Sequence, residues 1–565
     1  MLCKLNFIKI LFIPVLFFFV ACNNHKTIKQ KEIVKAPEKM DDQISDNLKS
    51  VLDYASTAGG KINDSVQLGQ LKIVNAFYTK NNYQGVWSKT ETWNPVADSM
   101  FQFIKKSKYY GLYPGDYHFK ELKNLRARIE ADSMTRMDAV AWTKADLMLT
   151  DAFMKVLKDL KEGRIIDDSI SIVSNERSAD SFFIPKLKNA LSLNSVTSTF
   201  ESVEPNNIYY TSLKEMLPAF VDNMDTRKYL YINFPYIDTL QFYKDLHKRL
   251  LQSGIGSDTT ELPDSVTLSK EVKKYQKKHK LTVDGKPGEE TIRTLNSYDY
   301  EKLRRIAITL DRYKQLPVLP EKYLMVNIPA FGLKVWDNDT VVVESKVIVG
   351  KPTTPTPLLT SAISNMVTYP NWTIPESIIK KDILPALQVN PGYLASKGFV
   401  LVDYQGKQVD PYKVKWEKYK TGIPWKVVQE SGFENALGIF KFNFNNPYYV
   451  YLHDTNQRYL FDNAYRALSH GCVRVQNWQA VAFYIAKNDS LALAEKNGQH
   501  LSYNIDSIKN WIANQDRKTI MVKNRLPLFI QYFTCEADEG KIIFFADIYN
   551  KDQFIEEKYF PDKSF

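Results

Sequence analysis

The chain has 565 residues, more than one hydrophobic core accommodates, and this length predicts roughly three or four domains. Apolar residues make up 44% of the sequence and charged residues 25%, the proportions of ordinary globular protein. The net charge is +11, but basic and acidic residues are interleaved along the chain, which excludes the basic stripe of a nucleic-acid-binding protein. A mild basic excess also fits an anionic polymer of the cell envelope.

Residues 1–21 have the features of a bacterial secretory signal. Lys4 and Lys9 form a charged start, and the roughly dozen mostly apolar residues that follow are too few for a transmembrane helix. A small residue followed by Cys22 resembles a lipobox, with Phe19 where leucine is usual. We therefore expect a lipoprotein of the periplasm, held on a membrane by lipid on Cys22. A simple signal peptide and an uncleaved anchor are the alternatives.

The next part of the chain divides into a tether and a helical scaffold. Residues 22–60 are rich in Lys, Asp, Asn and Ser, which predicts a flexible tether. Apolar residues then recur at three- and four-residue spacing, for example in DLMLTDAFMKVLKDLKEG, and predict helices. We expect a helical scaffold domain over 61–255, to which a helix in 300–320 returns.

Residues 256–299 interrupt this scaffold. A basic amphipathic helix runs into an Asp284-Gly285 turn, and a second helix begins near Gly288 and ends before Asn296. This pattern predicts a small helical module in which a turn joins the two helices. His279 lies among lysines, which favours a solvated residue over a metal ligand.

From residue 321 the sequence becomes rich in β-branched and aromatic residues broken by Gly, Asn, Asp and Pro. It predicts a mainly-β catalytic domain over 321–500. Residues 371–430 have helical and irregular character and predict an inserted lid. A C-terminal segment, 501–565, is expected to complete the fold with a helix and a β-hairpin over 526–548. The fold class is therefore multidomain α+β.

His453 and Cys472 are the candidate catalytic pair. His453 lies near the end of the strand-like run YYVYLHDT, whose alternation places Tyr449, Tyr451 and His453 on one face. Cys472 follows in the motif SHGCVRV. An imidazole can take the thiol proton, and the resulting thiolate attacks a carbonyl carbon. Tyr451 either lines a donor pocket or packs in the core.

The rest of the motif SHGCVRV is expected to support this chemistry. Backbone N–H groups of the turn from His470 to Cys472 are candidate oxyanion donors, and Gly471 lets the backbone pack closely there. His470 is either a second catalytic imidazole or part of a hydrogen-bond framework, and Ser469 orients His470 or the loop. The Arg474 guanidinium suits a substrate carboxylate, support of the oxyanion loop or a structural ion pair.

The segments HDT and SHGCVRV together resemble the signature of the L,D-transpeptidases, which cross-link peptidoglycan through a cysteine thioester. Residues 256–299 resemble the small three-helix peptidoglycan-binding module that accompanies them, and the helical region resembles the scaffold of the large multidomain members. The lid resembles their capping subdomain, where Trp372 matches and is expected to contact substrate. Further matches are Asn435-Ala436-Leu437-Gly438 and Lys441-Phe442, although related chains have a proline-rich lead where this one has GFE.

The resemblance implies a concrete reaction. A tetrapeptide stem would be attacked at the carbonyl of its third residue, D-alanine would leave, and another stem's amine would accept the acyl group in a 3→3 cross-link. The histidine is commonly oriented by a backbone carbonyl, so Asp454 is expected to shape the turn rather than complete a triad. No cofactor or metal is implied. Carbapenem-type inhibitors would be expected to acylate Cys472.

Four other functions remain open. Water as acceptor would make the chain an L,D-carboxypeptidase, and a protein amine would attach proteins to the wall. A zinc peptidase could use His453, Asp454, His470 and Cys472, although the sequence has no HExxH pair. A non-catalytic wall anchor would be expected to have lost His453 or Cys472. Cys472 and Cys535 could also form a disulfide, but we expect a free nucleophile and a buried core thiol.

Overall fold

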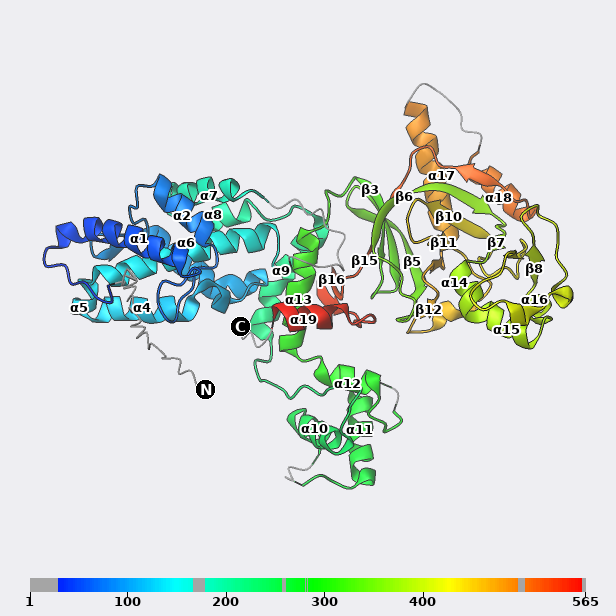
Figure 1. Ribbon diagram of the computed structural model, residues 1–565, viewed down its shortest axis with the longest axis horizontal. Coiled ribbons are helices and arrows are strands. Elements are labelled where there is room, and N and C mark those ends of the chain that lie inside the picture. Colours follow the sequence, from blue (N-terminus) through cyan, green and yellow to red (C-terminus); the bar gives the residue numbers. More distant parts are fainter. Residues whose placement is uncertain are drawn as a thin grey trace, which may run out of the picture. The chain divides into compact units, whose positions relative to one another are not determined.

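The computed structural model describes residues 29–165, 178–256, 261–279, 281, 283–495 and 503–560 (Figure 1). The expected signal peptide and Cys22 lie outside these residues. Within the described part of the chain, no helix combines the length and apolar character needed to cross a membrane. The chain divides into two compact units, one comprising 1–98 with 120–154 and the other comprising 99–119 with 155–565.

The tether predicted over 22–60 is wrong for its second half. Residues Met40–Thr57 form helix α1, and six apolar residues along one face of it are buried. Their spacing of three and four residues is the helical period, which the abundance of polar residues between them obscured. The buried apolar residues of α1 are Met40, Ile44, Leu48, Val51, Leu52 and Ala55.

The first unit is a helical bundle around the buried carboxylate of Asp146. Tyr78 donates to Asp146 Oδ1, and the backbone N–H groups of Val86 and Trp87 donate to Oδ2. Burial raises the pKa of Asp146 to about 6, although these donors act in the opposite direction. The elements that lie wholly or partly in this unit are α1, α2 (Leu71–Lys80), β1 (Ser88–Lys89), β2 (Thr92–Trp93), α3 (Pro95–Lys106), α4 (Phe119–Ala131), α5 (Ser133–Arg136) and α6 (Ala139–Lys161).

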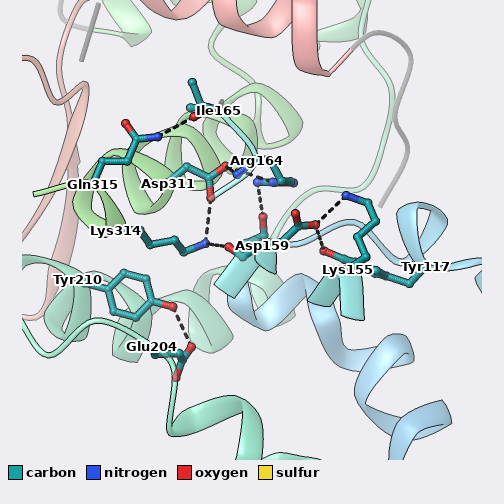
Figure 2. Close-up of polar contacts among 11 residues, drawn as sticks. Tyr117, Lys155, Asp159, Arg164, Ile165, Glu204, Tyr210, Asp311, Lys314 and Gln315 are labelled. Carbon is teal, nitrogen blue, oxygen red and sulfur yellow. Dashed lines mark hydrogen bonds and ion pairs between the residues drawn. The ribbon is translucent and has the colours of Figure 1, made fainter. Parts of the chain in front are cut away.

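Helix α13 (Asp299–Lys314) returns to the helical scaffold, as the sequence predicts. Arg164, just beyond α6, donates to Asp311 Oδ2 at 3.2 Å, and Lys314 Nζ donates to Asp311 Oδ1 and to the Asp159 carbonyl at 2.9 Å (Figure 2). The Lys314 and Asp311 side chains are fully buried. The other helices of this region are α7 (Asp180–Leu193), α8 (Thr197–Glu201), α9 (Ile208–Asn223) and α19 (Lys551–Tyr559).

The small module consists of α10 (Thr239–Gln252), α11 (Ser265–Lys278) and α12 (Glu289–Asn296). It begins earlier than residue 256, the predicted boundary, because α10 shares one apolar core with the other two helices. Phe242, Leu246 and Leu250 pack there against Leu268 and Val272. Asp238 and Asp264 begin α10 and α11 by accepting backbone N–H groups.

The mainly-β domain is built on one sheet whose path closes on itself. The strands follow the order β10-β11-β13-β5-β4-β3-β15-β6, in which β15 comprises Pro527–Gln531, and β10 also pairs with β6. Apolar side chains from these strands, together with α17 and α18, form its core. The elements are β3 (Lys322–Asn327), β4 (Gly332–Asp337), β5 (Thr340–Gly350), β6 (Leu359–Thr368), β10 (Phe440–Phe444), β11 (Leu452–His453), β12 (Ala467–Ser469), β13 (Val473–Val475), α17 (Trp478–Glu495), α18 (Ile505–Ala513) and β14 (Thr519–Met521).

The predicted hairpin over 526–548 is wrong in its first half. Residues Pro527–Gln531 form β15, an inner strand that pairs in parallel with β3 and antiparallel with β6. The hairpin is shorter and comprises β16 (Cys535–Asp538) and β17 (Lys541–Phe544). Both long apolar runs resemble strands, but only the tertiary pairing with β3 and β6 shows that the first one belongs to the main sheet.

Residues 371–430 form a subdomain with its own core, which we call the lid. Its strands pair in the order β7-β9-β8, and helices pack their apolar residues against them. The elements of the lid are β7 (Trp372–Thr373), α14 (Glu376–Ile378), α15 (Leu384–Val389), α16 (Tyr393–Ser396), β8 (Phe399–Val402) and β9 (Lys426–Gln429).

Candidate active site

Three adjacent strands bring Lys441, His453 and Arg474 into one row. In the antiparallel pairing of β10 with β11, Lys441 is opposite His453. In the parallel pairing of β11 with β13, His453 is opposite Arg474. Cys472 directly precedes β13, so the thiol lies beside this row. The imidazole is thus flanked by a cation on each neighbouring strand.

His453 is fixed in one tautomer. Its Nδ1 lies 2.5 Å from the Asp454 carbonyl oxygen, which can only accept a hydrogen bond, so Nδ1 carries the proton. Nε2 therefore has the lone pair of a base. Burial, Arg474 and Lys441 together lower the pKa of His453 to about 3, although the carbonyls of Asp454 and Leu437 oppose them. The ring is neutral at ordinary pH and is ready to accept a proton.

Cys472 is also neutral in the resting site. Burial raises the pKa of its thiol, and Tyr451, Lys441 and Arg474 act against that increase. The thiol is free, as is that of buried Cys535, which agrees with the expectation for both residues. A neutral thiol beside a neutral, Nε2-basic imidazole can form the thiolate by proton transfer, and the two cations stabilise the negative charge.

Ser469 holds the turn that carries the thiol. Its hydroxyl donates to the Cys472 carbonyl at 2.6 Å and accepts the Gly471 N–H at 3.1 Å. Since this bond engages the Gly471 N–H, the expected oxyanion donors reduce to the N–H groups of Cys472 and His470. Gly471 is needed for its φ of 118° rather than for close packing, because an added Cβ would be 3.6 Å from its nearest neighbour.

Tyr451 lies in the site, but the predicted strand before it is wrong. Tyr449 has a φ of 56° and is 84% exposed, so it does not share a face with Tyr451 and His453. The Asn446 side chain causes this, because it accepts N–H groups of Tyr448 and Val450 and donates to the Val450 carbonyl. A side chain thus bonds the backbone groups that a strand ladder would use.

The Tyr451 ring links the lid and the cationic row. Lys441 Nζ lies 3.7 Å from its centroid, and the ring is 5.6 Å from the His453 ring. Burial raises the pKa of the phenol well above its usual value, and Cys472 adds to that increase. The Trp372 indole of the lid is close enough to lower the pKa of Tyr451, although its Nε1–H makes no hydrogen bond among the described residues. Trp372 therefore lies close to Tyr451, and its expected contact with substrate stays a prediction.

The His470 side chain contacts the lid rather than Cys472. Its ring is 40% exposed, and its Nε2 lies 3.1 Å from Asp382 Oδ2 of the lid. The side chain therefore joins the Cys472 turn to the lid.

Arg474 donates to Gln457 Oε1 at 3.1 Å, and its buried Nε has no acceptor among the described residues. No carboxylate pairs with Arg474 in that part of the chain.

Asp454 shapes the turn after β11, as predicted. Its Oδ2 accepts the Ile439 N–H at 3.0 Å and a hydrogen bond from Arg458 at 2.9 Å. Gly438 has a φ of 62°, and a Cβ there would lie 2.2 Å from the Asp454 carboxylate. The glycine of the NALG segment thus lets Asp454 pack against the backbone. Only the carbonyl of Asp454, and not its carboxylate, contacts the His453 ring.

The residues of the zinc alternative do not converge. His453 Nδ1 faces a carbonyl, His470 faces the lid, and the Asp454 carboxylate is held by Ile439 and Arg458. Within the described residues, no group of three or more potential metal ligands gathers.

Sequence reasoning gave Lys441 no role. Its position in the Lys441-Phe442 match was visible, but only the strand register places its ammonium beside Tyr451 and Cys472. Burial lowers the pKa of this lysine, and the nearby Cys472 thiolate would raise it.

Comparison with known proteins agrees with this geometry. Three family models match the chain: "Scaffold domain" over 72–217, "Putative peptidoglycan binding domain" over 241–295 and "L,D-transpeptidase catalytic domain" over 321–486. A curated protein of Haemophilus influenzae, "Putative L,D-transpeptidase", is 33% identical over 244 residues, which are 43% of this chain and 47% of that protein. The chain therefore spans about half the length of that relative.

An L,D-transpeptidase from Mycobacterium smegmatis is 15% identical with a TM-score of 0.19, and covers 37% of this chain and 58% of its own. A mutant L,D-transpeptidase from Enterococcus faecium is 9% identical with a TM-score of 0.16, and covers 50% of this chain and 89% of its own. Both scores are low, and the assignment depends on the family models and the curated relative.

Residues 321–486 are an L,D-transpeptidase catalytic domain, in which a thiol and a neutral imidazole occupy the site. Residues 72–217 and 241–295 match the scaffold and peptidoglycan-binding models in the same chain, and part of the chain is similar to a curated putative L,D-transpeptidase.

Proposed function

We propose that this chain is a peptidoglycan L,D-transpeptidase that forms 3→3 cross-links through a thioester on Cys472. One observation carries the proposal: His453, whose Nε2 is unprotonated, is in register with Lys441 and Arg474 on the two neighbouring strands, and Cys472 directly precedes the strand that carries Arg474. The lid and the peptidoglycan-binding module support two bulky substrates, as cross-linking requires.

In the first half-reaction, the Cys472 proton moves to His453 Nε2 and the thiolate attacks the carbonyl carbon of the third stem residue. The oxyanion takes N–H donors from the turn, and the cations of Lys441 and Arg474 stabilise the negative charge. The C–N bond to D-alanine then breaks, and the imidazolium proton passes to the leaving amine. The product is an S-acyl enzyme.

In the second half-reaction, the amine of another stem attacks the thioester and loses a proton to His453. The C–S bond breaks and the proton returns to the sulfur, which restores the resting pair. One amide bond has replaced another, so the step needs no nucleotide. Water in place of the amine would give an L,D-carboxypeptidase, and a protein amine would give attachment of that protein to the wall.

We further propose that the enzyme acts in the periplasm, anchored by lipid on Cys22. The lipobox-like sequence supports this location. Labelling with radioactive palmitate tests it: label should enter the wild type and be absent from Cys22→Ala.

The reaction is tested by mass spectrometry on protein lacking residues 1–22, incubated with disaccharide-tetrapeptide. Dimers equal to two monomers less one alanine, absent in Cys472→Ala and unaffected by chelator, are expected. Tripeptide monomers alone would assign a carboxypeptidase instead. Activity that survives in Cys472→Ala would refute the cysteine mechanism, and loss of activity on chelation would support the zinc alternative. A carbapenem should add its mass to the wild type and not to Cys472→Ala.

A further inference from the structure

The turn that carries Cys472 is held by a second hydroxyl besides that of Ser469. Thr356 is 1% exposed, and its Oγ1 donates to the Gly471 carbonyl at 2.9 Å while it accepts the Gly350 N–H at 2.8 Å. The carbonyl can only accept and the N–H can only donate, so the direction of both hydrogen bonds is fixed. Neither half-reaction uses Thr356 directly.

The Gly471 carbonyl belongs to the same peptide group as the Cys472 N–H, one of the two expected oxyanion donors. This peptide bond is trans, so its C=O and its N–H point in opposite directions. Because the carbonyl oxygen is fixed on Thr356, the direction of the Cys472 N–H is fixed as well. A hydrogen bond accepted by the carbonyl also polarises the N–H and makes it a better donor.

Tyr549 closes the loop from Gly350 to Thr356. Its phenol donates to the Gly350 carbonyl at 2.7 Å and accepts the Thr356 N–H at 3.1 Å. Burial raises the pKa of Tyr549 to about 12, so the phenol keeps the proton that it donates. Both ends of the loop are thus bound to one hydroxyl. The same loop also binds the Ser469 carbonyl through the Lys351 N–H at 2.9 Å.

Tyr549 lies beyond residue 486, where the match to the catalytic domain ends. Its backbone N–H donates to the Tyr532 hydroxyl at 2.9 Å, and the two rings are stacked with centroids 5.7 Å apart. Tyr532 donates to Asp547 Oδ1 at 2.5 Å, and the Asp547 side chain accepts the first backbone N–H groups of α19. A segment outside the matched domain therefore determines where the Thr356 hydroxyl lies.

We propose that Thr356 and Tyr549 are positioning residues for acyl transfer, which direct the Cys472 N–H at the oxyanion through the Gly471 carbonyl. The inference deepens the proposed function and rests on it, since only attack on a carbonyl develops an oxyanion. Both residues act through one peptide group rather than on the thiol. Their loss should therefore slow the chemical step and leave substrate binding unchanged.

Two reactions of Cys472 in the full chain separate this role from a structural one. Acylation by a carbapenem opens the β-lactam C–N bond through an oxyanion, whereas alkylation by iodoacetamide displaces iodide and adds to no carbonyl. Mass spectrometry measures both rates, and kcat and KM are measured with disaccharide-tetrapeptide. Thr356→Val removes the hydroxyl with little change of shape, Thr356→Ser keeps it, and Tyr549→Phe removes only the phenol oxygen.

Thr356→Val should slow acylation and lower kcat about thirtyfold, because a misdirected N–H loses part of what an oxyanion donor contributes. KM and the rate and pH profile of alkylation should equal those of the wild type. Thr356→Ser should recover most of the activity. Tyr549→Phe should lose about tenfold, since the Thr356 hydroxyl remains. The double variant should be no slower than Thr356→Val, because both residues act through one hydrogen bond.

Thr368→Val is the matched control. Thr368 in β6 is fully buried, and its hydroxyl also donates to a carbonyl, that of Asp516 at 2.6 Å, and accepts an N–H, that of Lys518 at 2.9 Å. The loss of this hydroxyl should lower the melting temperature about as much as Thr356→Val does. It should leave kcat unchanged.

Several results would overturn the assignment while the proposed function stands. They are an unchanged kcat in Thr356→Val, an equal loss of acylation and alkylation in that variant, and an equal loss of kcat in Thr356→Ser or Thr368→Val. Tyr549→Phe decides the matter in the same way if Thr356→Val fails to fold. A wild type that is alkylated but neither acylated nor able to cross-link would refute both proposals.

Discussion

His470 Nε2 and Asp382 Oδ2 lie 3.1 Å apart, and this contact joins the turn of the nucleophile to the lid. His470 comes from the SHGC motif itself, one residue from Gly471 and two from Cys472. The position of the lid is thus coupled directly to the backbone that presents the thiol. Both side chains are about 40% exposed, so solvent and salt screen the pair.

Asp382→Asn should loosen the lid without changing its shape. Exposed pairs contribute about 0.2–1 kcal/mol, so the apparent KM for the acceptor should rise up to about fivefold at low salt, with a smaller effect at high salt. Steady-state kinetics at two salt concentrations measures this. Asp410→Asn, which alters an exposed lid carboxylate near Lys413, is the control and should leave KM unchanged. Equal effects of both variants would argue against a specific contact.

Lys441→Met should raise the pKa of the Cys472 thiol, since a cation that stabilises the thiolate is lost. A change of one unit corresponds to about a tenfold loss of thiolate, and we expect kcat/KM to fall by roughly this factor. The pH dependence of thiol alkylation measures the shift directly. Lys441→Arg should recover part of it, whereas the exposed Lys426→Met should behave as wild type. An unchanged alkylation profile in Lys441→Met would contradict this role.

His453 should make the protein sensitive to acid. Its pKa is about 3 in the fold and about 6.5 when unfolded, so between these values the unfolded chain binds a proton that the fold excludes. This contribution to the free energy of unfolding is complete above pH 6.5 and decreases as the pH falls toward 3. In His453→Asn, the loss between pH 7 and about 4.5 should be smaller by about 2–3 kcal/mol.

Urea unfolding at the two pH values measures this difference. His470→Asn, which replaces a 40% exposed ring, serves as the control and should lose stability as the wild type does. The same acid loss in wild type and His453→Asn would show that the ring is not held neutral.

Asp311→Asn should destabilise the helical scaffold by about 3–5 kcal/mol, because Arg164 and Lys314 would remain buried without their counter-charge. Burial raises the pKa of Asp311, but these two cations outweigh it and lower the pKa overall. Thermal unfolding measures the change. Asp506→Asn, which breaks the exposed pair with Lys509, should shift the melting temperature little. Similar shifts for both would contradict the buried network.

Much of the site could be predicted from the sequence because its chemistry is local. A thiol, an imidazole and a tight glycine turn lie within a short stretch, in the segments HDT and SHGCVRV. The neutral thiol-imidazole pair also needs no acidic partner, in agreement with the expectation for Asp454. The three-helix module and the mainly-β domain have clear periodic patterns, although the module begins with α10, which precedes the basic helix α11.

The remaining features depend on contacts between distant segments. Lys441 becomes part of the site through strand register, His470 faces the lid because Asp382 lies opposite it, and β15 joins the main sheet through β3 and β6. The sequence by itself determined which groups could react. Only the tertiary structure decided the charge around His453, because burial and neighbouring cations, which set its pKa, arise when separate strands pair.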